Sequence, residues 1–160
     1  TGLRFFTVYG PWGRPDMALY LFCDAILAGR PIQIFNHGDM RRDFTYIDDV
    51  VAGVLAVLDR PPGASPDRPP FGLYNIGNNR PEPLLRLIAV LEASLGRQAT
   101  KELVAMQAGD VKETFADIGP IMRDCGFAPS TPIDVGVPRF VQWYLEYHEV
   151  MGRKNLWKKA

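Results

Sequence analysis

The sequence predicts an α/β fold, and three observations lead to that fold class. Short runs of β-branched and aromatic residues alternate with segments of helical spacing along the whole chain. The 160 residues are 47% hydrophobic and 22% charged, a balance typical of one globular domain with a real core. The expected strands are few and scattered, so they do not add up to a complete six-stranded Rossmann sheet.

The first sixty residues alternate strand and helix. The expected elements are a strand at 3–9, a helix at 15–29, a strand at 31–35, a polar loop at 36–43 and a helix at 46–62. The first strand is aromatic and β-branched, and we expect it to be buried and to end at the Gly10-Pro11 turn. Gly29 stops the first helix, and Asp48 and Asp49 favour the positive N-terminal end of the second.

The remaining hundred residues continue the alternation without an internal repeat. The expected elements are a Pro-rich surface loop at 61–70, a strand at 72–77, an amphipathic helix at 84–95, a strand at 102–106, a short helix at 118–125, a helix at 135–151 and a basic tail at 151–160. Pro61 and Pro62 end the helix before the loop, and Gly96 ends the helix that starts at Leu84.

Composition and spacing argue against several classes of function. Eighteen basic and eighteen acidic side chains cancel, which speaks against a broad nucleic-acid or membrane footprint. No stretch approaches 18 consecutive apolar residues, and no signal peptide is visible. Cys23 and Cys125 lie far apart, which fits buried thiols in a reducing cytoplasm. His37 and His148 lack ligand spacing, so we expect no metal site.

The stretch RFFTVYGPWGRPDMA offers half of a dinucleotide-binding fingerprint. Gly10 and Gly13 precede a helix, but Asp16 holds the third glycine position, where its carboxylate would repel a pyrophosphate. The alternative is a Gly-Pro turn that shapes a strand-to-helix crossover. No tyrosine has a lysine four residues later, and no G-x-S-x-G elbow occurs. The chain itself is therefore expected to hold no catalytic residue.

A second informative stretch, PIQIFNHGDMRRDFTYIDDV, contains two adjacent arginines between a strand and a helix. Arg41 or Arg42 could make bidentate contacts to a diphosphate. The alternative is that both pair with neighbouring carboxylates, namely Asp39, Asp43, Asp48 or Asp49. Gln33 and Phe35 could offer polar groups and a flat ring to a nucleobase, although an aromatic residue there is also a candidate for the core.

Five blocks of sequence resemble, in family order, the C-terminal portion of UDP-glucuronate 4-epimerases. The blocks are GLRFFTVYGPWGRPDMAL, FNHGDMRRDFTYIDDVV, LYNIGNN, MQAGDVKETFAD and GFAPSTPIDVGVPRFVQWY. These enzymes are NAD-dependent epimerases/dehydratases of the extended short-chain dehydrogenase/reductase superfamily. The resemblance implies a fragment of an extended Rossmann-type fold. Residues 1–150 would hold the last Rossmann strand and the substrate-binding lobe, residues 151–160 a basic tail, and the N-terminal NAD-binding portion would be absent.

The same resemblance assigns roles to nine residues. Phe5 and Phe6 would lie near the nicotinamide, Thr7 and Arg14 near the hexuronate carboxylate, Gln33 and Phe35 near the uridine, Arg42 at the diphosphate, and Gln107 and Asp110 at the diphosphate and a ribose hydroxyl. Relatives often carry a second arginine before the Gly-Asp pair, where this chain has Gln107. Affinity for the diphosphate would therefore depend more on Arg42.

The activity implied for the intact enzyme is interconversion of UDP-glucuronate and UDP-galacturonate through a 4-keto intermediate, with NAD as cofactor. The chain alone would be inactive, and its partners would be the UDP-sugar, the NAD-binding portion and a second copy in a homodimer. Two alternatives stay open: another nucleotide-sugar enzyme, such as a UDP-glucuronate decarboxylase or a dTDP-glucose dehydratase, and a non-catalytic nucleotide-sugar binding module.

Overall fold

The structure is a computed structural model that describes residues 1–64, 66–67 and 69–151. Its helices are α1 (Ala18–Leu27), α2 (Ile47–Leu58), α3 (Leu84–Leu95), α4 (Gly119–Cys125) and α5 (Ile133–Val150), with a 3₁₀ turn η1 at Phe35–Gly38. Its strands are β1 (Gly2–Phe5), β2 (Thr7–Tyr9), β3 (Ile32–Ile34), β4 (Arg41–Arg42), β5 (Phe44–Tyr46), β6 (Leu73–Ile76), β7 (Glu82–Pro83) and β8 (Lys101–Leu103). The predicted α/β class is confirmed. Of the basic tail predicted at 151–160, residues 152–160 lie outside the described residues.

The strands pair two by two. β1 runs parallel to β6, β2 parallel to β5 and β3 parallel to β8, while β4 and β7 are antiparallel. Parallel neighbours need long crossovers, and helices supply them here, which is the pattern of an α/β chain. As predicted, the described strands do not form a six-stranded Rossmann sheet.

The single buried strand predicted at 3–9 is wrong. The strand is interrupted at Phe6. Before the interruption β1 pairs with β6, and after it β2 pairs with β5. The Phe6 N–H still bonds the Ile76 carbonyl at 3.0 Å, at the end of the first ladder. Phe5 is 53% exposed, and within the predicted strand only Tyr9 is buried, although Leu3, Phe6 and Val8 pack partly against the smaller core.

Other boundaries of strands and helices differ from the predicted ones for local reasons. The polar loop predicted at 36–43 contains part of η1 and the short strand β4, because Arg41 pairs with Pro83 of β7. The helix predicted to start at residue 46 starts at Ile47, after the unpredicted strand β5, and it ends at Leu58, before the two prolines. The prediction for 84–95 is confirmed at both ends, with Gly96 at φ 63° as its left-handed cap.

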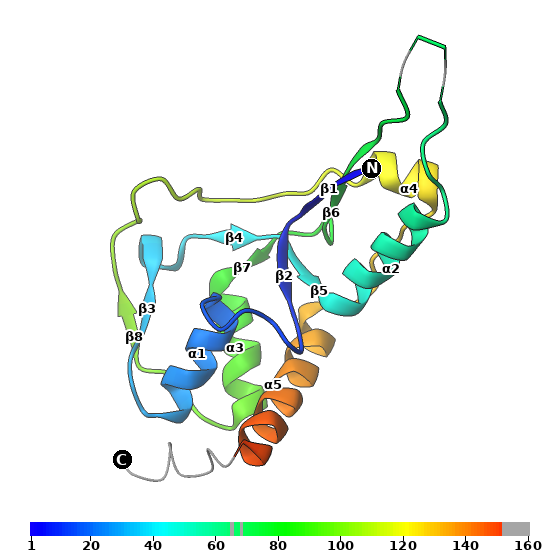
Figure 1. The fold of residues 1–160 in the computed structure, drawn as a ribbon. Coiled ribbons are helices and arrows are strands. Elements are labelled where there is room, and N and C mark those ends of the chain that lie inside the picture. The colour runs from blue at the N-terminus through cyan, green and yellow to red at the C-terminus, as the bar shows by residue number, and fades with distance from the viewer. Residues whose placement is uncertain (65, 68, 152–160) are drawn as a thin grey trace.

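Two hydrophobic cores lie at opposite ends of the molecule (Figure 1). The larger core joins α1, α3 and α5 to strands β2, β3 and β5, and Tyr144 and Leu87 are fully buried in it. The smaller core packs α2 and α4 around Ile76 of β6 and Phe127. Both cysteines are free and buried, as expected.

A buried carboxylate joins the segments around the site. Asp43 is fully buried between β4 and β5. Its carboxylate accepts hydrogen bonds from the backbone N–H groups of Asn78, Asn79 and Ala116 at 2.6–3.1 Å. A carboxylate that accepts several N–H bonds costs little to bury and fixes its partners in space. Asp43 therefore ties the segment after β6 and the segment before α4 to the strand that carries Arg42.

Candidate functional site

The candidate site is a cleft of about 650 Å³ beside α1. Its lining comes from α1 and the residues on either side of it, from strands β2 to β5, and from the segments that hold Leu84, Gln107 and Asp110. The cleft is lined by Thr7, Asp16, Met17, Ala18, Leu21, Phe22, Asp24, Ala25, Arg30, Pro31, Ile32, Gln33, Phe35, Met40, Arg42, Phe44, Leu84, Gln107 and Asp110. An apolar cavity with a few convergent polar groups is the usual form of a small-molecule site.

Six of the nine residues singled out in the sequence line this cleft. They are Thr7, Gln33, Phe35, Arg42, Gln107 and Asp110. They come from β2, β3, η1, β4 and the segment after β8, so they meet only when the chain is folded. The cleft thus brings together a cation, a carboxylate, an amide pair, a hydroxyl and a ring.

Arg42 lies at the cleft with three hydrogen bonds. Its Nη1 donates to the carbonyls of Arg41 at 2.9 Å and Lys112 at 3.2 Å, and its Nη2 donates to Oδ1 of Asp110 at 2.8 Å. Its side chain is only 16% exposed. The guanidinium is thus preorganised, because backbone carbonyls and a carboxylate fix its plane.

The alternative partners considered for the arginines are engaged elsewhere. Asp39 pairs with Lys112 at 2.6 Å, Asp48 lies 3.9 Å from Arg139, and Asp49 accepts the Thr131 N–H at 2.9 Å. Arg41 does form a surface pair, but with Glu113 at 3.4 Å. Both arginines therefore do pair with carboxylates, as the alternative supposed, but with Glu113 and Asp110 from beyond position 109 and not with the four neighbouring aspartates.

Arg14 lies near the cleft but is not among the residues that line it. Its Nε and Nη2 donate to the two oxygens of Asp16 at 3.0 and 2.5 Å, and both side chains are exposed. The hydrogen bonds from Arg14 lower the pKa of Asp16, and those to Asp16 raise the pKa of Arg14. Asp16, which does line the cleft, is thus neutralised by the arginine two residues before it.

The two phenylalanines assigned to the nicotinamide lie apart from the cleft. Phe5 is exposed on β1, and Phe6 packs partly against the smaller core around Ile76. Neither lines the cleft. Phe5 is the last residue of β1, which pairs with β6 (Figure 1), and Phe6 lies between β1 and β2.

The cleft also holds a charged pair that was not predicted from the sequence. Asp24 Oδ2 accepts a hydrogen bond from Arg30 Nη2 at 3.1 Å, and Asp24 Oδ1 accepts one from the buried Tyr144 hydroxyl at 2.9 Å. Helical spacing offered a signal, because Met17, Leu21 and Asp24 recur at intervals of four and three residues. The pair adds polar groups to the α1 wall.

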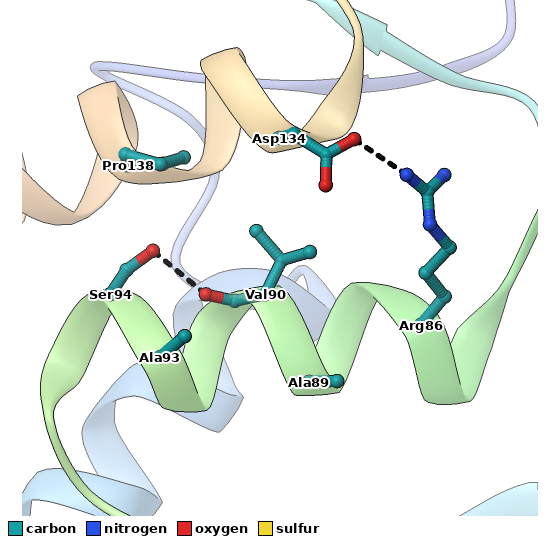
Figure 2. Close-up of a pocket in the computed structure, with 7 residues that line it drawn as sticks. All are labelled: Arg86, Ala89, Val90, Ala93, Ser94, Asp134 and Pro138. Atoms are coloured by element: carbon teal, nitrogen blue, oxygen red, sulfur yellow. Dashed lines mark hydrogen bonds and ion pairs between the residues drawn. The ribbon is translucent and has the colours of Figure 1, made fainter.

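A second hollow, between α3 and α5, lacks this chemistry (Figure 2). Its floor is made of small side chains such as Ala89 and Ala93, and none of the nine residues lies in it. Its polar groups already bond one another: Arg86 donates to Asp134 at 2.6 Å, and Ser94 donates to the Val90 carbonyl at 2.7 Å. The cleft beside α1 is therefore the candidate site.

The part of the chain that the structure describes shows neither a metal site nor a membrane span. It holds no group of three histidine, cysteine or acidic residues placed to bind a metal ion. None of its helices is both long and apolar enough to cross a membrane.

Comparison with known proteins shows which enzymes this chain resembles. Residues 1–77 match the NAD dependent epimerase/dehydratase family. The fold agrees: the structure superposes on a Bacillus cereus UDP-glucuronic acid 4-epimerase, solved with UDP-glucuronic acid and NAD, with a TM-score of 0.79 and 34% identity. That match covers 91% of this chain and 45% of the solved one. The chain is thus related to the NAD dependent epimerases and dehydratases.

The individual relatives have more specific names than the family model. The chain is 48% identical to protein CapI of Staphylococcus aureus, over 93% of this chain and 48% of the relative. It is also 48% identical to UDP-glucuronate 4-epimerase 4 of Arabidopsis thaliana, over 92% of this chain and 36% of the relative. The resemblance to UDP-glucuronate 4-epimerases drawn from the sequence motifs is confirmed. The chain spans about half the length of these relatives or less.

Proposed function

We propose that this chain is the nucleotide-sugar-binding portion of an NAD-dependent enzyme that interconverts UDP-glucuronate and UDP-galacturonate. The observation that carries the proposal is the cleft itself, where six residues assigned from separate motifs converge. The 34% identity to an epimerase solved with UDP-glucuronic acid and NAD supports the same substrate. The enzyme would act through a 4-keto intermediate and belong to the isomerases.

In this proposal different residues of the cleft bind different parts of the UDP-sugar. Arg42, held by backbone carbonyls, faces the diphosphate, and Gln107 adds hydrogen bonds without charge. Gln33 and Phe35 at the end of β3 contact the uridine, and Asp110 accepts from a ribose hydroxyl. A planar guanidinium fixed in advance binds an anion with little loss of side-chain entropy.

The sugar end of the substrate would meet β2 and the segment before α1. Thr7 lines the cleft there, and Arg14 lies close by in its pair with Asp16. A hydroxyl and a guanidinium suit the carboxylate of a hexuronate. The contribution of this chain to the reaction would be to orient the sugar ring, which lowers the entropic part of the barrier.

NAD would be held mainly outside this chain. The turn after β2 does not fit a pyrophosphate, because Asp16 stands where a dinucleotide loop needs glycine and the exposed ring of Trp12 stands beside it. Reversible hydride transfer at carbon 4 is the chemistry that NAD supplies in such an enzyme. Phe5, exposed on β1, is offered toward the portion that binds it.

The proposed division is a substrate-binding portion at 1–150, a tail at 151–160 and a separate NAD-binding portion. Exposed apolar residues support a contact with that portion or with a second copy in a homodimer, since large apolar patches mark interfaces. They are Phe5, Phe71 and Leu73 near β1 and β6, and Val51, Leu55 and Leu58 on α2. Two free buried thiols support a reducing, cytoplasmic location.

Product analysis on the intact protein tests the proposal. With NAD and UDP-glucuronate we expect UDP-galacturonate, with no release of carbon dioxide and no net change in NAD absorbance. Carbon dioxide release would assign a decarboxylase instead. Loss of water from a dTDP-hexose would assign a dehydratase, and binding without turnover would assign a non-catalytic module.

A further inference from the structure

The turn that follows β2 holds a tryptophan in a backbone conformation that tryptophan rarely adopts. Trp12 has φ 62°, in the left-handed region. The Gly13 N–H donates to the Gly10 carbonyl at 3.2 Å, so Pro11 and Trp12 are the central residues of a β-turn. Glycine normally fills the third position of a turn when φ is positive there. Strain of this kind persists only where the surroundings impose it.

Two aromatic rings of α5 impose this conformation. The ring of Trp12 lies 5.5 Å from that of Trp143 and 5.4 Å from that of Tyr147, in tilted and edge-on geometry. Trp143 and Tyr147 stack on each other at 5.4 Å, one helical turn apart. Edge-on and tilted aromatic pairs are attractive, so the two contacts offset the strain of the turn. The rest of the Trp12 ring stays open, with the residue 76% exposed.

The entry to the turn is also held by α5. Tyr9, the last residue of β2, is buried so close to Gly136 that a Cβ on this glycine would lie 2.1 Å from the Tyr9 hydroxyl. The chain is therefore fixed to α5 just before the turn by Tyr9, and at the tip of the turn by Trp12. Residues 10–13 are called the Trp12 turn below.

The exit of the Trp12 turn leads directly to the cleft. Arg14 follows it, and the Arg14 carbonyl accepts the Met17 N–H at 3.2 Å. Asp16 and Met17 line the cleft, and α1 starts immediately after them. The conformation of the Trp12 turn thus sets where Arg14 and Asp16 stand at the cleft.

We propose that Trp12 is a positioning residue, and that its ring, held by Trp143 and Tyr147, keeps the Trp12 turn in the conformation that presents Arg14 to a hexuronate carboxylate. The inference deepens the proposed function and rests on it. It makes the aromatic face of α5, remote from the cleft, part of the discrimination between UDP-glucuronate and a UDP-hexose without the carboxylate.

The substitution Trp12→Gly tests the role of the Trp12 ring separately from the role of the backbone conformation. Glycine suits the positive φ better than tryptophan does, so a purely conformational role predicts an unchanged or more stable protein with unchanged substrate preference. A role for the ring predicts that the ratio of kcat/KM for UDP-glucuronate to kcat/KM for UDP-glucose falls about tenfold to a hundredfold, because misplaced binding groups cost rates of that order. Affinity for UDP alone should not change.

Three further variants complete the test on the intact protein. Trp12→Phe should retain most of the preference, Trp143→Ala should reproduce the loss, and Trp12→Gly with Trp143→Ala should lose no more than either alone. Leu145→Ala on the exposed side of α5 is the matched control and should change nothing. An unchanged preference in Trp12→Gly overturns the role of Trp12. A wild-type protein without preference for UDP-glucuronate overturns the proposed carboxylate recognition, and this inference falls with it.

Discussion

Arg42 Nη2 lies 2.8 Å from Oδ1 of Asp110, a contact between residues 68 positions apart in sequence. It joins β4 to the segment after β8, and both side chains line the cleft. With two bonds from Nη1 and one from Nη2, two of the five guanidinium N–H groups are outside the described contacts. A diphosphate would use these two or compete with Asp110 for the third.

The variant Arg42→Ala tests this arrangement in the intact protein. It removes charge-assisted hydrogen bonds worth roughly 1.5–3 kcal/mol each, so affinity for UDP should fall on the order of tenfold to a hundredfold. Gln107 carries no charge to compensate. NAD affinity should stay the same, because the cofactor contacts are proposed outside this cleft. Calorimetric titration of UDP and of NAD measures both.

Two variants control that result. Arg42→Lys should restore part of the affinity, since an ammonium keeps the charge but not the planar fork. Arg41→Ala removes the neighbouring arginine, which pairs with Glu113 at the surface, and should leave UDP affinity unchanged. Equal UDP dissociation constants in wild type and Arg42→Ala would leave Arg42 with a structural role only.

The pair of Arg14 and Asp16 gives a second prediction. Asp16 takes up the Nε and Nη2 edge of the Arg14 guanidinium, with bonds at 3.0 and 2.5 Å, so this edge is not open to a hexuronate carboxylate. Asp16→Asn removes the competing charge at nearly constant shape, so affinity for UDP-glucuronate should rise by about twofold to tenfold, within the range of exposed ion pairs.

Two controls accompany Asp16→Asn: a second substrate, UDP-glucose, and a second variant, Arg14→Ala. UDP-glucose has no carboxylate, so its affinity should stay the same in Asp16→Asn. Arg14→Ala should lower affinity for UDP-glucuronate and also leave UDP-glucose unchanged. A fall in UDP-glucuronate affinity in Asp16→Asn would mean that Asp16 holds Arg14 in its binding position rather than competing for it.

Local patterns predicted those elements that depend on local sequence alone. The helix α3 was predicted to the residue, because an apolar stripe on one face and Gly96 at the end mark it without outside help. The break at Phe6 was not predictable in this way. It exists because β1 finds its partner at Leu73–Ile76 and β2 finds another at Phe44–Tyr46. Strand pairing across such distances leaves no periodic signal in the strand itself.

The candidate site shows the same difference between local features, which the sequence predicts, and contacts between distant segments, which it does not. Residue types and the family resemblance selected Arg42 and Asp110, but not their mutual contact, which joins segments far apart in the chain. Asp43 was considered only as a surface partner for arginine, whereas it is fully buried and accepts three backbone N–H bonds. A buried acceptor of this kind depends on the positions of distant amides, which sequence patterns do not encode.

The chain by itself should show no epimerase activity, which is a third prediction. Its sequence has no Tyr-x-x-x-Lys pair and no complete glycine-rich loop, so it lacks the base and the dinucleotide cradle. Incubation with NAD and UDP-glucuronate should leave the substrate unchanged by chromatography. Formation of UDP-galacturonate by this chain alone would contradict the proposed division of labour.

The same chain should self-associate, which is a fourth prediction. Phe5 on β1, Leu73 on β6 and Phe71 before β6 are all exposed apolar residues. Light scattering over a range of concentrations should show a rising mean mass, and Phe5→Ser with Leu73→Ser should reduce it. Leu145→Ser, on the exposed face of α5, is the control. A constant monomer mass at all concentrations would count against the exposed face as an interface.

The last prediction concerns stability and pH at the end of α3. Burial raises the cost of charge on Glu92, but a hydrogen bond from Lys101, one from the Ala99 N–H and the charge of Lys101 outweigh it and lower the pKa of Glu92. A carboxyl whose pKa is lower in the folded state stabilises the fold above its unfolded pKa of about 4.3. That contribution disappears as pH falls through the folded pKa.

Lys101→Met removes the partner and keeps much of the side-chain volume. At pH 7 the free energy of unfolding should fall by about 1–3 kcal/mol, the cost of leaving a buried charged group with fewer partners. The difference from wild type should shrink as pH falls through the lowered folded pKa of Glu92, because Glu92 is then protonated in both proteins. Urea denaturation at several pH values measures it, with Glu102→Gln on the same strand as the charge control. A difference that stays constant from neutral to acid pH would show that Lys101 stabilises the fold by packing and not through the charge of Glu92.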